Sequence, residues 1–248
     1  MKNLKITPTI AFIFCGCLLA MSACTKLRYE KALSDASQPS NAKRAFNLTS
    51  VSKNNTDLKW KEIGGESYVL VSAWKADTVY YKNDVKTGFY NTGKYPIWVT
   101  VAPDLQKKLA TEKRKYKSQK AMDKRLRQLF GLPPGDKKLY FVEFWVRPAD
   151  LARPCVDTDV TDNSCELFLP KDATPDCESL MWLANQARAS FADSSLYRRY
   201  PFTQLGYTYD WNPKNKKHEG LSEFVIGSNR NIVVNKVYKT MDYAYKLK

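Results

Sequence analysis

The chain has 248 residues, with 40 basic and 25 acidic side chains and a formal net charge of +15. Aromatic residues make up 13% of it, which is too many for a disordered composition and enough to build a core. A basic surface fits nucleic acid, anionic lipid or lipopolysaccharide phosphate, so the compartment decides between these partner classes.

The first segment has the layout of a secretory signal. Lys2 and Lys5 give a positive start, and a mainly apolar run follows over residues 6–20. This run is shorter than the roughly 20 apolar residues that cross a bilayer, and it has the size of a signal-peptide core. We predict a signal peptide over residues 1–23. An ordinary secretory signal or an N-terminal membrane anchor is the alternative.

The residues Met21-Ser22-Ala23-Cys24 resemble the lipobox of bacterial lipoproteins. The resemblance implies that Cys24 carries a diacylglycerol and, after cleavage, an acylated amine such as a palmitoylated one. Acyl chains hold a protein on a membrane because each buried methylene contributes about 0.8 kcal/mol. In this family an Asp after the cysteine marks retention at the inner membrane. Thr25 stands there instead, which implies the outer membrane. We expect the domain to face the periplasm, where nucleic acid is not an expected partner, and exposure at the cell surface is the alternative.

Residues 24–56 are polar, and we predict that they form a flexible tether to a single domain over residues 57–248. Within the domain we expect a hairpin from strands over 66–74 and 77–83. Further strands are expected over 95–102, 139–148, 205–211 and in two parts of 223–238, with a last edge strand in 240–248.

Two main helices are expected. Apolar residues at near-helical spacing predict one long basic helix over 104–130, with an interruption near 117–120, and a second helix over 178–192. The fold class is therefore α+β, with a mainly antiparallel sheet and helices on one side. The strand–helix–strand run from 95 to 148 fits one parallel crossover.

Charge is segregated along the chain. Residues 104–138 hold twelve basic and four acidic side chains, whereas residues 155–178 hold seven acidic ones and one lysine. The plain interpretation of the basic run is a solvated helix face, and the alternative is a surface for an anionic partner.

Beyond the predicted signal peptide, the chain has three cysteines besides Cys24. Outside the cytosol cysteines tend to pair, and we favour a Cys155–Cys165 disulfide, which closes a polar loop and stabilises it by roughly 2.5–3 kcal/mol. Cys177 is then left over, as an inert buried thiol or a reactive one at the start of a helix.

The loop between these cysteines also suggests metal chemistry. The cysteine spacing matches no usual zinc site, and no metal or cofactor is expected. Asp157, Asp159 and Asp162 make calcium a minor option, although the glycine and the last glutamate of an EF-hand loop are missing. A hydrated acidic loop is the default interpretation.

Catalytic motifs are scarce. The one histidine, His218, lies in a lysine-rich loop, and no nucleotide-binding glycine motif is present. Glu143 and Asp150 flank the end of a predicted strand, which makes an envelope enzyme that acts on cell-wall glycan the alternative function.

The segment from 197 to 211 is rich in rings. Tyr207, Tyr209 and Trp211 share one face of a strand, and Arg198 and Arg199 precede them. Such a row fits a sugar-binding or protein-binding surface, and the alternative is that the rings pack in the core. We therefore expect a non-catalytic binding or assembly module, with an envelope protein, a glycan or lipopolysaccharide as partner.

Overall fold

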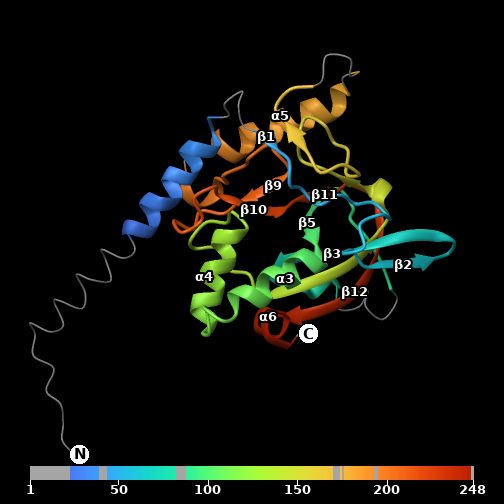
Figure 1. Cartoon of the computed structure of the whole chain (residues 1–248), viewed down its shortest axis with the longest axis horizontal. Helices are drawn as coiled ribbons and strands as arrows, with labels where there is room; N and C mark the ends of the chain where they lie inside the picture. The colour runs from blue at the N-terminus through green and yellow to red at the C-terminus, as the bar shows by residue number, and fades with distance from the viewer. Residues whose placement is uncertain are drawn as a thin grey trace, which may run out of the picture.

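The computed structural model describes residues 23–38, 44–81, 88–169, 174, 176–192 and 195–246. An eight-stranded sheet with antiparallel pairing lies at its centre, with helices packed against it, so the predicted α+β class is confirmed (Figure 1). The strand order is β4 (Phe89–Asn91), β12 (Asn231–Lys239), β6 (Tyr140–Val146), β3 (Glu66–Lys75), β5 (Ile97–Val101), β11 (Phe224–Ile226) and β7 (Leu151–Ala152), with β2 (Trp60–Ile63) also on β3.

The central strand β3 is buried on both faces. Val69 and Val71 join one core cluster, while Trp74 points into a second cluster beneath the helices. Strands β5 and β6 pair antiparallel with the two edges of β3, so they run in the same direction. The crossover between them is therefore parallel, as predicted, but β3 lies between its two strands.

The basic helix is divided as the sequence suggested. Helix α3 (Ala102–Glu112) ends before a short break, and α4 (Gln119–Leu129) begins at Ser118, whose side chain accepts a hydrogen bond from the Ala121 N–H. Both helices bury their apolar side against the sheet.

The tail differs from its prediction. Residues Thr240–Lys246 form the helix α6 and not an edge strand. Tyr243 and Ala244 are both buried, and the Tyr243 ring stacks on Phe141 of β6. Packing of adjacent apolar residues onto the helix layer therefore outweighs the strand-like composition of the segment.

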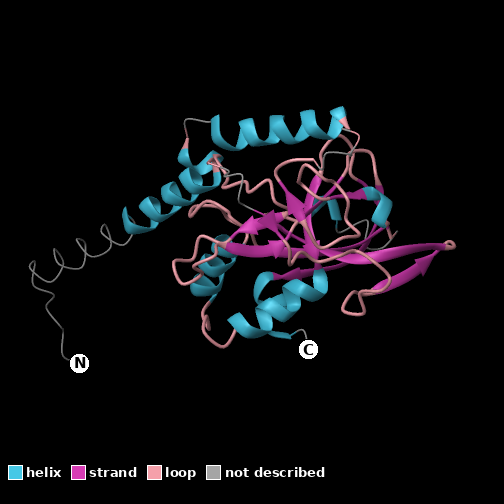
Figure 2. Ribbon diagram, turned by 45° about the horizontal axis from the view of Figure 1, so that its top comes forward, coloured by secondary structure: helices cyan, strands magenta, loops and turns pink. Residues whose placement is uncertain are grey.

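Helix α5 (Cys177–Ala192) confirms the second predicted helix and lies at the far end of the molecule from α6 (Figure 2). Short elements complete the fold: β1 (Arg44–Ala45) with β8 (Cys165–Glu166), β9 (Tyr207–Tyr209) with β10 (Glu219–Ser222), and the 3-10 turns η1 (Pro148–Asp150) and η2 (Leu196–Arg198).

The region predicted to be a tether contains ordered structure. Residues 23–36 form a helix that packs on the domain beside α5 (Figure 1). Tyr29, Ala32, Leu33 and Ala36 recur at helical spacing and are 0–5% exposed. The polar composition of residues 24–56 as a whole favours a tether, whereas this apolar stripe within it favours a helix that packs on the domain. Leu48 and Val51 are also buried.

The predicted hairpin has a different partner strand. β3 pairs with β2, which precedes it, through a turn at Gly64 and Gly65. Both glycines have positive φ, +59° and +83°, which favours glycine at this turn. Part of the expected 77–83 strand lies outside the described residues, and its beginning forms a helical turn.

In the part of the chain that the structure describes, no helix combines the length and apolarity that crossing a membrane requires. Residues 1–22 of the predicted signal peptide lie outside the described residues.

Candidate functional site

The predicted aromatic row is not an exposed surface. Tyr209 and Trp211 are 6% and 2% exposed and pack against the helix of residues 23–36. The Trp211 indole N–H donates to the carbonyls of Arg127 and Leu132 at 3.2 and 3.1 Å. Trp211 thus adds a donor to two carbonyl groups at and just beyond the end of α4, one of which, that of Arg127, also accepts from the Leu132 N–H, so its role is structural.

Arg198 and Arg199, which were predicted to join the aromatic row in one binding surface, lie apart from it. The Arg199 carbonyl accepts a hydrogen bond from the Tyr29 hydroxyl at 2.7 Å, and Arg198 is exposed in η2. Tyr207 and Tyr209 line a cavity that neither arginine lines. The five residues therefore do not form one patch, and the buried row gives no support to an assembly surface.

That cavity is the best-formed concave site among the described residues. Its volume is about 380 Å³, and it lies between β3, β5, β9, α5 and the segment after α4. Seven of its lining residues are aromatic: Trp74, Trp98, Phe130, Tyr200, Phe202, Tyr207 and Tyr209. Tyr200 is its exposed lining residue and marks its mouth, and the half-buried Pro96 and Gln186 also line it.

The inner end of the cavity is polar. Ser72 and Thr100 are directly paired across β3 and β5, and both are at most 2% exposed. Among the described residues, neither hydroxyl makes a hydrogen bond with good distance and angle. The Ser72 hydroxyl does lie beside that of Tyr243. Buried hydroxyl groups in proteins are usually bonded, so two unpartnered ones in a cavity wall indicate a site that a ligand or water would complete.

Glu223 adds a carboxyl group to the same end. Phe224 pairs with Val99 and points into the core, so the preceding residue lies on the face of Thr100. Glu223 is half-buried, and the partial loss of its hydration raises its pKa to about 8.

The backbone at Gly206 holds Glu223 in place. The Glu223 N–H donates to the Gly206 carbonyl at 2.9 Å. Gly206 has a φ of +69°, and a Cβ there would lie 2.8 Å from the Arg153 side chain. A larger residue would therefore disturb both the turn and the strand start that carries Glu223.

Two lysines lie at the other end. Lys75 is three residues along β3 from Ser72, and burial lowers its pKa to about 8, with a further contribution from nearby Lys138. The Lys138 ammonium is 3.3 Å from the Asp136 carboxylate. The cavity thus has an acidic inner end and a basic outer part.

Glu223, Ser72 and Thr100 were not among the predicted site residues. Each lies in a predicted strand, where an isolated polar residue reads as solvent-facing. Only the pairing of three strands distant in sequence brings them together, and a single sequence does not specify that pairing.

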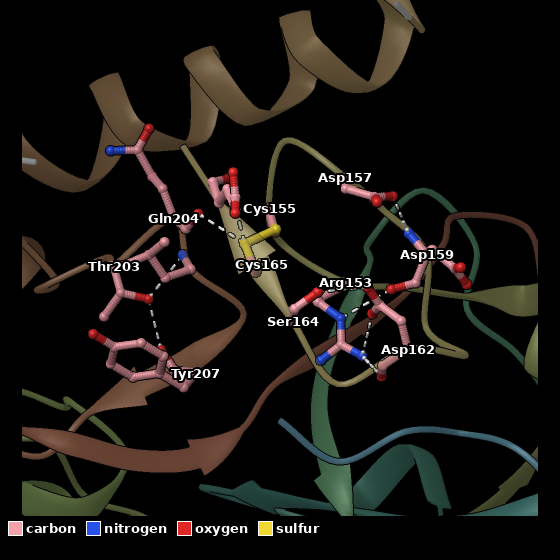
Figure 3. Close-up of a disulfide and its surroundings, with 12 residues drawn as sticks. Arg153, Cys155, Asp157, Asp159, Asp162, Ser164, Cys165, Thr203, Gln204 and Tyr207 are labelled. Carbon is pink, nitrogen blue, oxygen red and sulfur yellow. Dashed lines mark hydrogen bonds and ion pairs between the residues drawn. A yellow bond between two sulfur atoms is a disulfide. The ribbon is translucent and has the colours of Figure 1, made fainter. Parts of the chain in front are cut away.

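The predicted disulfide is present: Cys155 and Cys165 are bonded, with Cα atoms 6.3 Å apart. The loop that they close wraps around Arg153, which is fully buried (Figure 3). The guanidinium donates to the carbonyls of Asp159 and Asp162 at 2.9 and 2.8 Å. The loop therefore already surrounds a cation, and that cation is a side chain of the protein.

The acidic side chains of the loop have local roles. The Asp157 and Asp159 carboxylates accept backbone N–H groups two residues ahead, and Asp162 accepts from Arg153 and Ser164. Burial lowers the Arg153 pKa, and the three aspartates act against that shift. Within the described residues no cluster of metal-binding side chains forms, so the calcium option at Asp157, Asp159 and Asp162 finds no coordination geometry.

The two candidate catalytic carboxylates are both engaged. Glu143 accepts hydrogen bonds from Gln106, Asn235 and Tyr243 at 2.8–3.1 Å. Asp150 pairs with Arg147 at 2.7 Å and with Arg230 at 3.6 Å. Neither lines the cavity, so they do not flank a common space there.

The remaining candidates are placed as follows. His218 is half-buried and stacks on Tyr209 with ring centroids 5.0 Å apart. Cys24 lies at the start of the first described helix, and Cys177 is the first residue of α5; both are free and exposed. The expectation of a buried Cys177 is therefore wrong.

Comparison with known proteins adds no relative. No family model, no curated protein and no solved structure matches the chain.

Proposed function

We propose that the chain is a lipid-anchored protein of the bacterial cell envelope whose domain binds a small ligand in the aromatic cavity without transforming it. The cavity carries this proposal. Its volume is about 380 Å³, and its wall is mainly apolar with a few converging polar groups. Ligand sites in proteins share this range, roughly 300–1,000 Å³, and this composition.

The cavity supports binding rather than catalysis. A serine or threonine nucleophile needs a neighbouring base within hydrogen-bond reach. In the described structure the Ser72 and Thr100 hydroxyls have no such partner, and the histidine, His218, does not line the cavity.

Two features support the envelope location. The lipobox-like residues that end at Cys24 imply a lipid anchor, and Thr25 after it implies the outer membrane. The Cys155–Cys165 disulfide fits an oxidising compartment such as the periplasm.

The binding function is tested by blocking the mouth of the cavity. Gln186 lines it from α5, whereas the adjacent Asn185 is exposed and does not. The neutral probe 2-phenylethanol should shift the indole N–H signal of Trp98 in the native chain and in Asn185→Trp. It should not do so in Gln186→Trp. Equal binding by both variants would place the probe elsewhere and contradict the proposal.

A further inference from the structure

The inner end of the cavity is acidic and has no cation of its own. Glu223 lines it, and Glu143 lies directly across from Ser72 in the neighbouring strand. Glu143 is 2% exposed and is held by an amide from each of Gln106 and Asn235 and by a hydroxyl. Among the ion pairs of the described residues, none involves either carboxyl group. Glu143 is a buried acid without a basic partner, and the half-buried Glu223 has none either among the described residues, which is unusual.

Three oxygen-bearing side chains converge at this end. Thr100 pairs with Ser72 on one side, and the ladder between β11 and β5 continues toward a Glu223–Thr100 pair on the other. The three side chains therefore form one row across the sheet, on the face that the cavity exposes. Two of them are buried hydroxyls: Thr100 has no hydrogen-bond partner among the described residues, and Ser72 lies beside the Tyr243 hydroxyl.

Aromatic faces lie next to this row. Two residues along from Ser72 and Thr100, on the same faces of their strands, stand Trp74 and Trp98, and both line the cavity. Tryptophan faces attract cations and also provide a flat apolar surface.

We propose that the cavity binds a ligand that carries a primary ammonium group, placed between Glu223, Thr100 and Ser72, on a ring-sized apolar body that lies against Trp74 and Trp98. The inference rests on the proposed binding function and names its ligand class. A primary ammonium has three N–H donors, which match one carboxylate and two hydroxyl acceptors. It also supplies a positive charge to Glu223, which lines the cavity and has no ion-pair partner among the described residues.

The lysines do not fill this role. Lys75 is three residues further along β3, roughly 10 Å from Ser72 at the rise of an extended strand. Lys138 is paired with Asp136. Both side chains thus belong to the outer part of the cavity, where the body of the ligand ends.

Ammonium binding depends on pH through Glu223, which must be ionised to pair with a cation. Below its pKa of about 8, affinity should fall about tenfold per pH unit, because the proton must leave first. The other titratable groups of the cavity are Lys75, Lys138, Tyr200, Tyr207 and Tyr209. Burial raises the pKa of Tyr207 to about 12 and that of the other two tyrosines, which moves all three further from this window. The pKa of Lys75 is about 8, so on the acidic side of the pH 6–8 range Lys75 keeps its proton and its charge does not change.

Three matched probes test the ligand class on the full chain: 2-phenylethylamine, 2-phenylethanol and 3-phenylpropionate, with affinities from calorimetry between pH 6 and 8. The amine should bind at least tenfold more tightly than the alcohol at pH 8, and the carboxylate more weakly than both. Amine affinity should rise with pH while alcohol affinity stays constant. Glu223→Gln should abolish the preference and its pH dependence, and the exposed control Glu219→Gln should keep both.

The outcomes separate the two proposals. If the alcohol or the carboxylate binds as tightly as the amine, or if amine affinity is independent of pH in the native chain, the ammonium proposal is overturned and ligand binding stands. If none of the three probes binds, the proposed function fails with it. The pH series on the native chain decides the matter even if Glu223→Gln does not fold.

Discussion

Arg153 explains why the loop between the two bonded cysteines is acidic. Its guanidinium is fully buried, and the loop carbonyls and Asp162 surround it. A buried cation without such partners is strongly unfavourable, so the loop and the arginine depend on each other. The run that suggests a metal site in the sequence is thus the environment of a side chain.

Replacing Arg153 should therefore destabilise the domain. Arg153→Met removes several charge-assisted hydrogen bonds and leaves loop carbonyls unpaired, and the free energy of unfolding should fall by about 3 kcal/mol or more. Urea denaturation measures this change. The exposed pair of Lys53 with Glu62 provides the control, since Lys53→Met should change stability by less than about 1 kcal/mol. Similar small losses in both variants would contradict the role of Arg153.

Glu223 should make stability depend on pH. Its pKa rises from the usual 4.5 to about 8 on folding, so between these values the native state holds a proton that the unfolded state has released. Unfolding therefore becomes easier as pH rises, by about 1.4 kcal/mol per pH unit from this group. Urea denaturation from pH 5 to 8 should show native stability falling relative to Glu223→Gln. A difference that stays constant over this range would contradict the raised pKa.

At the scale of elements, the helix of residues 23–36 changes the organisation most. Its apolar stripe packs on Trp211 and Tyr209, and the Tyr29 ring meets the Trp211 ring edge-on at 5.6 Å. This contact joins the first described helix to the segment that supports the end of α4 and the cavity wall.

Tyr29 and Leu27 offer a matched pair in this helix. Tyr29 is fully buried, whereas Leu27 is 63% exposed. Tyr29→Ala should lower the free energy of unfolding by about 3–5 kcal/mol, and Leu27→Ala by about 0.5 kcal/mol or less. Chemical denaturation followed by tryptophan fluorescence measures both. If Tyr29→Ala costs as little as Leu27→Ala, the helix is not part of the folded domain.

Sequence periodicity predicts the regular elements well. Strands β3, β5 and β6 and helix α5 are five to sixteen residues long, a span that a local pattern can specify. The helices in the tail and in the expected tether are harder to predict from the sequence. Helix α6 and the helix of residues 23–36 gain stability from contacts with Phe141 and Trp211, which are distant in the sequence.

The same limit applies to the site at the scale of the whole molecule. The disulfide could be predicted because its cysteines are close in sequence and the loop needs a staple. The cavity could not, because Ser72, Thr100 and Glu223 meet only after β3, β5 and β11 pair. The sequence predicts Tyr207 and Tyr209 as part of an exposed aromatic row, whereas in the structure they line the cavity.

The proposed lipid anchor would determine how the whole molecule is placed. Cys24 lies between one and two helical turns before the buried Tyr29, so a lipidated Cys24 would hold the domain directly against the membrane. Cys24→Ala should abolish incorporation of an alkyne-labelled palmitate and move the protein out of the outer-membrane fraction. Labelling that persists in this variant would show that Cys24 is not the site of acylation.

The central claim is that the cavity is a ligand site, and an NMR titration of the full chain with 2-phenylethylamine at pH 8 tests it most directly. We predict saturable shifts of the indole N–H signals of Trp74 and Trp98, which line the cavity, and none for Trp60 or Trp145, which do not. Absence of saturable shifts for Trp74 and Trp98, or equal shifts of all four signals, would contradict a binding site in the cavity.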